Sequence, residues 1–556
     1  MLNAAKGLGR KKDKLFNFRP AFFAAVSLIF GIIFGYYKIV YGISAWWLLS
    51  LVPIVVLPFF FCEGKGDFAV RFVALSLLLA TFFLGFSAFR YQLYDYTRCG
   101  YYNGEHTVVG TVVSYVDNEG SFKVVLKDIS IDEKEEKGTL NAYLPTSYVE
   151  NIHIADIVLV CGKVQTDTAY SKGEFNAYAI DDTVRFTLSG VTSYEKVGRS
   201  KDVFLRIRDR VERVVCNGMD ESSASVVLGV LVGDTTKIEG GLLENMRQGG
   251  IAHIFAVSGL HVGALYAFVL LLFSKTRLKT SNVVFRFVTL SAILLFYAAI
   301  CGFSPSIVRA TVLCLVGYAM RNLGGATDSL NTLGLAAVII LLFTPCALFE
   351  IGFQLSFAAC LGIVLFAKRI GQVCDECYKT VRKIYPRRYT EEEKKALDAG
   401  DTLPPTVGER FYRAVTSVVS ASLAAQLFTA PLQYLAFGYF SGWSFLLNLI
   451  FVPLISVAFA GILLIVVLAC LLPIGLSGYL LYIPAMLFHA TLLVFEVVDF
   501  SSFAITNVQL SHASCVCYYG GVIFLTDKWN VSKKQRICLS VLCFTAFIAI
   551  LALLNL

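Results

Sequence analysis

The chain has 556 residues, of which 56% are hydrophobic and only 16% are charged, and its formal net charge is +8. Soluble globular domains contain fewer apolar and more charged residues, so this composition excludes an ordinary soluble protein. Apolar segments of about 20 residues recur along the chain, and a helix needs about that length to cross a bilayer. We therefore expect a polytopic α-helical membrane protein.

The apolar segments predict about 13 membrane-spanning helices. The expected spans are 21–37, 45–62, 68–89, 251–273, 283–301, 307–320, 329–343, 351–367, 414–434, 445–472, 479–497, 514–525 and 537–556. Segment 514–525 is short enough to be re-entrant, and Pro453 is a candidate break in segment 445–472.

Basic residues near the N-terminus predict the orientation. Segment 1–19 holds six Lys or Arg residues and one Asp, a net charge of +5, and the positive-inside rule places such a segment in the cytoplasm. Three crossings then put the residues after 91 outside the cell. The charged segment 368–413 falls inside, and the C-terminus falls outside.

Residues 92–200 differ from the rest because apolar and polar residues alternate, as they do in strands. About five such runs, separated by Gly, Asn, Asp and Pro, predict a small external β-barrel of the OB type. This segment has 10 Lys and Arg against 16 Asp and Glu, a net charge of −6. An acidic barrel favours a structural or docking role, and direct DNA binding through a groove stays the alternative.

The segment after the barrel predicts an amphipathic basic helix. Val203, Ile207 and Val211 recur at helical spacing among arginines, which indicates a helix on the membrane surface, with a nucleic-acid contact as the alternative. The chain then divides into a cytoplasmic N-terminus (1–19), N-terminal membrane helices (20–91), the external β domain (92–200), the amphipathic helix and a polar loop (201–250), core helices (251–367), a cytoplasmic charged loop (368–413) and C-terminal membrane helices (414–556).

Polar residues gather at the mouth of the apolar segment that follows. Within 233–263 stand Asp234, Arg247, His253, Ser258 and His261. Hydrocarbon accepts such groups only where protein or a water-filled cavity surrounds them. The cluster is therefore a candidate functional site.

The same residues resemble the signature of the ComEC family of competence channels. The resemblance rests on Gly233-Asp234, Arg247, Gly250, His253, AVSGLHVG (256–263), GFSPSIVRA (302–310), DSLNTLGLAA (328–337), PCALFEIGFQLSFAACLGI (345–363), SLAAQLFTAPLQYLAFGYFS (422–441), Asn448, Pro453 and, in the β domain, SKGEFNAY (171–178). It implies a plasma-membrane channel that imports one strand of external DNA during natural transformation.

A path for single-stranded DNA through a bilayer must be wet and lined with polar or cationic groups. The residues that we expect along it are Asp234, Arg247, His253, Ser258, Gly259, His261, Arg309, Gln354 and Asn448. We expect no catalytic residue, no metal and no cofactor.

His253 and His261 are eight residues apart, about two helical turns, which places both on one face of a helix. Three interpretations of this pair stay open. They join helices as satisfied polar groups, contact DNA phosphate or gate the path, or bind metal with Glu244 or Asp234. Ser258 beside His261 also admits a nucleophile and base. The alternative functions are thus a membrane-embedded hydrolase or metalloenzyme using His253, Ser258 and His261, and a transporter of another polyanion or solute.

The resemblance also bears on partners. Longer ComEC-like proteins carry a metallo-β-lactamase-type domain, and none of the six histidines here stands in an HxHxDH pattern, so we expect no nuclease of that type. The expected partners are single-stranded DNA, membrane lipid, and a separate DNA receptor, nuclease and cytosolic helicase or single-strand-binding protein; the oligomeric state is not predicted. Cys99 and Cys161 are the candidate pair for a disulfide, because both fall in the external domain.

Overall fold

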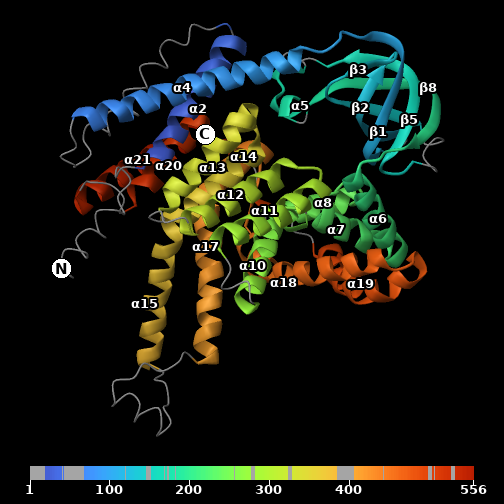
Figure 1. The fold of residues 1–556 in the computed structure, drawn as a ribbon. Coiled ribbons are helices and arrows are strands. Elements are labelled where there is room, and N and C mark those ends of the chain that lie inside the picture. The colour runs from blue at the N-terminus through green and yellow to red at the C-terminus, as the bar shows by residue number, and fades with distance from the viewer. Residues whose placement is uncertain are drawn as a thin grey trace.

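The protein, seen here in a computed structural model, is mostly helical with one β domain (Figure 1). The structure describes residues 19–40, 42, 68–118, 121–145, 152–167, 170–171, 174–181, 183–255, 257–276, 282–322, 328–384, 406–442, 444–498, 504–505, 508–526 and 532–555. In these ranges eight helices are long and apolar enough to cross a membrane, by length and composition. The expected span 45–62 and residues 1–18 lie outside the described residues.

Two helices that run parallel to each other, α2 (Pro20–Val40) and α4 (Phe68–Thr97), begin the described chain. They approach closely because Gly31 and Gly85 have no side chain: a Cβ on either glycine would collide with a backbone carbonyl of the other helix. Helix α2 also packs on α13 (Ser329–Phe343). There Arg19 Nε lies 2.7 Å from Asp328 Oδ2, on the residue that caps α13.

The β domain lies between α4 and the central helices. Its elements are β1 (Asn103–Asn118), β2 (Ser121–Ile131), β3 (Lys134–Glu136), β4 (Thr139–Pro145), β5 (Asp156–Thr166), β6 (Tyr170–Ser171), β7 (Glu174–Phe175), α5 (Ala177–Asp181) and β8 (Val184–Arg199). The main sheet has the order β1-β5-β8-β4-β2-β3, and β1 also pairs with β2, so the pairing of five strands closes on itself. All these pairs are antiparallel except β4 with β8. Alternate residues such as Val108, Leu126 and Phe186 point inward and form the core of the domain.

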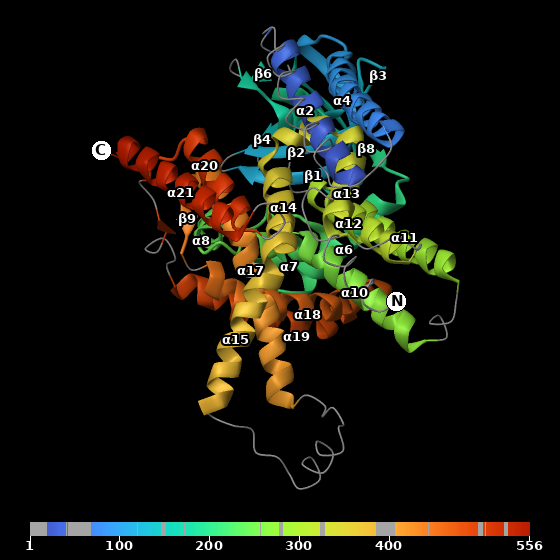
Figure 2. The same ribbon diagram turned by 90° about the vertical axis from the view of Figure 1, so that its left-hand side faces the viewer.

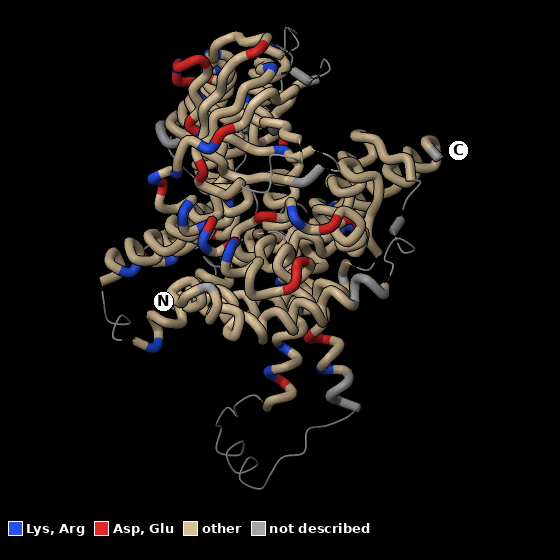
Figure 3. The backbone as a smooth tube through the Cα atoms, turned by 90° about the vertical axis from the view of Figure 1, so that its right-hand side faces the viewer, with Lys and Arg blue, Asp and Glu red and all other residues tan. Residues whose placement is uncertain are grey.

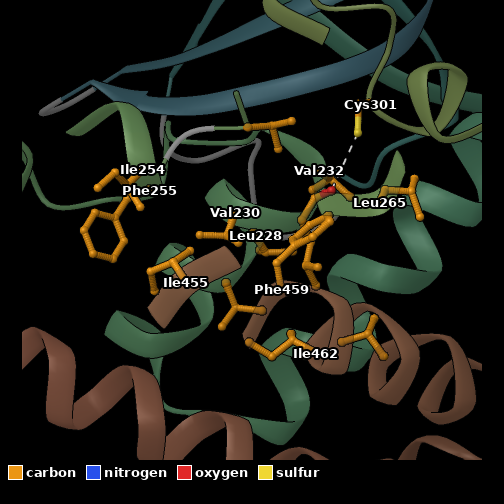
Figure 4. Close-up of a cluster of buried hydrophobic side chains, with 14 of the residues drawn as sticks. Leu228, Val230, Val232, Ile254, Phe255, Leu265, Cys301, Ile455, Phe459 and Ile462 are labelled. Carbon is orange, nitrogen blue, oxygen red and sulfur yellow. Dashed lines mark hydrogen bonds between the residues drawn. The ribbon is translucent and has the colours of Figure 1, made fainter. Parts of the chain in front are cut away.

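A central group of helices packs beneath the β domain. Its members are α6 (Val203–Gly218), α7 (Glu221–Val232), α8 (Gly240–Gln248), α9 (Ala252–Phe255), α10 (Gly259–Lys275), α11 (Val283–Ile300), α12 (Pro305–Asn322), α18 (Ser444–Leu471) and α19 (Ile474–Val497). Leu228 and Val230 of α7, Phe255 of α9 and Phe459 of α18 meet in one apolar cluster (Figure 4). Every residue of α7 from Ser223 to Val232 is buried, so this helix is enclosed by protein.

The remaining helices complete the membrane part. They are η4 (Pro345–Phe349), α14 (Ile351–Gly362), the π-helical turn η5 (Ile363–Ala367), α15 (Lys368–Ile384), α17 (Val407–Phe437), α20 (His512–Phe524) and α21 (Lys533–Asn555), with the short pair β9 (Phe440–Ser441) and β10 (Ala504–Ile505). Helices α15 and α17 lie side by side and project away from the rest (Figures 1 and 2).

Charged and apolar residues are distributed as a membrane protein requires. Charges concentrate in the β domain, in the helices below it and at the projecting ends of α15 and α17, while long stretches of helix carry none (Figure 3). Large apolar side chains are exposed on several helices, including Val457 (79%), Ile483 (75%) and Leu553 (76%). Exposed apolar surface on this scale indicates contact with lipid.

Four expectations need correction. The span expected at 251–273 is divided, because α9 ends at Phe255 and a separate helix starts at Gly259. Helix α7 lies within the segment expected to be an amphipathic helix and polar loop. Helix α18 continues through Pro453, which is therefore not a break.

The expected disulfide between Cys99 and Cys161 is not formed, and both thiols are free. Cys161 on β5 lies opposite Thr107 on β1, whereas Cys99 precedes β1. Thr166 Oγ1 donates to the carbonyl of Gly100 over 3.2 Å, which places the residue after Cys99 at the far end of β5. Thr166 is five strand residues from Cys161, roughly 16 Å at about 3.3 Å per residue, and a disulfide allows only about 7 Å between Cα atoms.

Candidate functional site

The first element of the site is a buried ion pair at the end of α7. Gly233 ends this helix in the left-handed conformation at φ 84°, which a glycine adopts without strain. The next residue, Asp234, is only 4% exposed, and its Oδ2 lies 3.7 Å from Nη2 of Arg208 on α6. The backbone N–H of Thr236 donates to Asp234 Oδ1 over 3.2 Å. The expected path residue Asp234 thus joins α6 to the turn after α7.

Ser258 and His261 form the N-terminal cap of α10. Leu260 N donates to Ser258 Oγ over 3.3 Å, and Ser258 N donates to His261 Nδ1 over 3.1 Å. Because Nδ1 accepts this bond, the proton of the neutral ring is assigned to Nε2. Among the described residues Nε2 is buried without a hydrogen-bond partner. The ring also packs edge-on against Phe459 of α18, with 4.8 Å between centroids.

This geometry does not favour the hydrolase alternative. Ser258 Oγ lies 3.3 Å from His261 Nδ1, but the same Nδ1 accepts the backbone N–H of Ser258 over 3.1 Å. It is therefore not free to take the hydroxyl proton as a general base must. In the described part of the chain no three His, Cys, Asp or Glu side chains are placed together to hold a metal ion. The arrangement that we observe is a helix cap that also joins α10 to α18.

His253 lies on the short helix α9 and is exposed to solvent. Its side chain hydrogen-bonds with the backbone of Gly250.

Arg309 lines a cavity of about 390 Å³ where the β domain meets the membrane helices. Lys127 of β2 lines the same cavity, as does Phe303, which is 55% exposed. Six residues of the motif GFSPSIVRA contribute to its wall: Gly302, Phe303, Ser304, Pro305, Val308 and Arg309. Two cations and an aromatic ring therefore border one space between two parts of the chain that are distant in sequence.

Gly259 and Gly352 pack close to Arg309 and its neighbour Ala310. A Cβ added to Gly259 would lie 3.6 Å from that of Ala310, next to Arg309, and one added to Gly352 would lie 3.2 Å from Arg309 Nη2. Two residues after Gly352, Gln354 Nε2 donates to the carbonyl of Leu348 over 3.1 Å.

The turn between α8 and α9 packs on the start of α18. A Cβ on Gly249 would lie 3.3 Å from Cδ1 of Leu447, the residue that precedes Asn448. The buried Oδ1 of Asn448 has no hydrogen-bond partner among the residues that the structure describes. Arg247 differs from the others because it is a surface residue, with Nη1 3.5 Å from Oε2 of Glu244.

A polar joint that the sequence did not reveal fixes the β domain to α6. The hydroxyl of Tyr115 on β1 donates a hydrogen bond to Glu212 Oε1 over 2.6 Å, and Lys237 pairs with the same carboxylate. Burial raises the pKa of Tyr115, and Glu212 raises it further. Burial alone would lower the pKa of Lys237, but the Glu212 carboxylate outweighs it and raises that pKa. The three residues lie on separate elements, so no local pattern marks them.

A larger cavity lies beside this joint. It has a volume of about 1500 Å³ and is bordered by Tyr115, Phe122 and Lys237 together with the carboxylates Glu221 and Glu239. Its wall carries both signs of charge, and its lysine, Lys237, is already paired with Glu212. A phosphate chain would meet repulsion there.

Comparison with known proteins adds a family. Residues 230–531, more than half of the chain, match the family described as "Competence protein". ComE operon protein 3 of Bacillus subtilis (strain 168) is 29% identical over 206 residues, which cover 36% of this chain and 26% of that protein. Competence protein ComA of Neisseria gonorrhoeae is 32% identical over 150 residues, or 25% and 22% of the two chains.

A third relative has no assigned role in its name. The MG316 homolog of Mycoplasma pneumoniae is 33% identical over 137 residues, which cover 25% of this chain and 33% of that protein. The chain therefore spans a third or less of each of these relatives. No solved structure matches.

Proposed function

The chain belongs to the competence protein family, and on that premise we propose that it is a membrane channel for the import of single-stranded DNA during natural transformation. The family links it to DNA uptake, and its apolar helices suit a membrane location. The channel path, its orientation and its partners are our proposals.

The observation that carries the proposal is the cavity bordered by Lys127, Phe303 and Arg309. A phosphate chain needs cationic contacts, and unpaired bases stack on aromatic rings. This cavity offers both at the junction of the β domain and the membrane helices. Its volume of about 390 Å³ falls at the lower end of the range for ligand pockets, about 300 to 1,000 Å³. We propose that the strand passes here, one nucleotide at a time.

Residues around this cavity take supporting roles in the proposed path. His253 is exposed to solvent, and we propose that it and Gly259 border the continuation of the path beyond Arg309. Gln354 and Asn448 supply neutral hydrogen-bonding groups near it. Asp234, Ser258 and His261 hold the helices that form its wall, and Arg247 lies at its surface end.

We propose that the closed circuit of five strands is a small OB-type barrel outside the cell, with the N-terminus in the cytoplasm. The closed pairing of β1, β2, β4, β8 and β5 supports the barrel. Its acidic surface suits docking, while Lys127 places one cation at the proposed entrance.

The proposed partners follow from the steps that import requires. External DNA must be captured, one strand must be removed, and the entering strand must be pulled and protected. We therefore propose a DNA receptor, a nuclease and a cytosolic helicase or single-strand-binding protein as separate proteins.

Transformation frequency tests this proposal. In a transformable bacterium that depends on this gene, Arg309→Gln should lower the frequency about tenfold or more, and Lys127→Gln by a few-fold, because each removes a phosphate contact. Arg98→Gln and Lys123→Gln, which change charges that do not border the cavity, serve as matched controls. Membrane levels of each variant must equal the wild type. Normal transformation by both cavity variants contradicts the proposed path.

A further inference from the structure

A second cationic pocket lies where α6 meets the C-terminal end of α18. It has a volume of about 480 Å³, and its wall consists of Arg199, Val203, Arg206, Ile207, Arg210, Arg213, Cys470 and Leu471. Four of these eight residues are arginines and none is acidic. It is separate from the cavity at Arg309, and it shares no residue with it.

Internal contacts hold three of the arginines in place. Arg210 donates to the carbonyls of Leu472 over 2.6 Å and Cys470 over 3.4 Å, which satisfies groups at the end of α18. Arg199 and Arg213 both bind the carboxylate of Asp209, which is only 3% exposed. One carboxylate thus serves two guanidinium groups, so the pocket keeps a positive charge.

Arg206 completes the pocket from the exposed face of α6. In the described part of the chain it forms no ion pair, and its side chain is exposed. A guanidinium group presents up to five N–H donors in a rigid fork that matches the oxygens of a phosphate. Preorganised arginines around one space are a suitable site for a phosphate group.

Apolar surface adjoins this charge. Leu471 at the end of α18 is 79% exposed, and Val203 at the start of α6 is 61% exposed. Both border the pocket, and Leu468 nearby is 47% exposed. A single strand of nucleic acid needs a longer basic track with aromatic rings, whereas this pocket has room for one phosphate group and an aliphatic rim. Charge beside exposed apolar residues is the pattern of a group at the lipid interface.

We propose that this pocket binds the phosphate headgroup of an anionic phospholipid, with the acyl chains lying along Val203 and Leu471. The lipid then fixes α6, and with it the adjoining β domain, against the membrane. The inference does not depend on the DNA-import function, because it rests on a different pocket.

Native mass spectrometry of the delipidated full chain in detergent tests the proposal, with phosphatidylglycerol as the probe and phosphatidylcholine as the zwitterionic comparison. We expect one phosphatidylglycerol molecule to bind preferentially. Arg206→Gln should weaken that binding about tenfold, since it removes a charge-assisted contact. Arg206→Lys should weaken it less, because the charge remains but the fork is lost. Lys201→Gln, which removes an exposed charge next to α6 outside the pocket, should bind as the wild type does.

Two competition experiments distinguish other phosphate sources. Inorganic phosphate at millimolar concentration should leave the lipid bound, and displacement by it would show a free-phosphate site instead. A short oligo(dT) should likewise leave the lipid bound; its binding, lost in Arg206→Gln, would assign the pocket to nucleic acid and overturn the lipid proposal. Equal affinity for the two lipids, or no effect of Arg206→Gln, would overturn it as well.

Discussion

The buried pair of Arg208 and Asp234 makes a sharp prediction about stability. At 3.7 Å the Coulomb attraction of the two charges is about 4.5 kcal/mol with an effective dielectric constant of 20. Most of this attraction offsets the cost of removing both ions from water, so the net contribution of the pair is small. Removing one partner leaves the other charge buried, and we expect Arg208→Met or Asp234→Asn to cost about 3 to 5 kcal/mol.

A double-mutant cycle in detergent measures this coupling through thermal unfolding followed by size-exclusion chromatography. Each single variant should lower the melting temperature by about 3 to 4 °C, because a chain of this length has an unfolding entropy of about 1.2 kcal/mol/K. The double variant Arg208→Met with Asp234→Asn should recover more than half of the summed loss, because no charge remains buried. Arg247→Met, which breaks an exposed pair, should change the stability by about 0.5 kcal/mol at most. Additive losses in the double variant would refute the reasoning.

Three further predictions concern single positions. Gly229→Ala should destabilise the protein by about 1 to 3 kcal/mol, because its Cβ would lie 2.6 Å from a backbone carbonyl on α9. Gly317→Ala has open space around it and should stabilise the protein by about 0.5 to 1 kcal/mol. The same melting assay compares the two variants. Ser258→Ala should cost about 1 kcal/mol through the lost cap and leave transformation near the wild-type level, whereas loss of transformation at normal protein levels would restore the hydrolase alternative. The N–H of Thr107 lowers the pKa of Asp132, so its carboxylate stabilises the β domain above its ordinary pKa and loses that effect as the pH falls through the lowered value. Acid unfolding of Asp132→Asn followed by circular dichroism should therefore depend less on pH in that range, and equal pH dependence contradicts this.

The sequence was sufficient for features that follow from local pattern. Alternation marked the β domain, whose strands run from Asn103 to Arg199 inside the expected 92–200. Apolar runs also marked α11, α13 and α18 to within a few residues, since each is long and uninterrupted. The family motifs pointed to residues around Arg309 before any contact was known.

Local pattern failed where tertiary contacts decide the structure. The apolar run of α7 has 12 residues, too few for a span, and only burial on all sides explains it. The division between α9 and α10 depends on the cap at Ser258 within an otherwise continuous apolar stretch. The joint of Tyr115, Glu212 and Lys237 unites three distant segments, and no single sequence contains that information.

Site-specific photocrosslinking tests the central claim most directly. A photoreactive amino acid at Phe303, which borders the cavity with Lys127 and Arg309, should crosslink to labelled DNA that is caught during import. The same group at Val197, which is 59% exposed on β8 and does not border the cavity, should not. We predict a crosslink at Phe303 that is lost in Arg309→Gln. Crosslinking at both positions alike, or at neither while import proceeds, would contradict passage of DNA through this cavity.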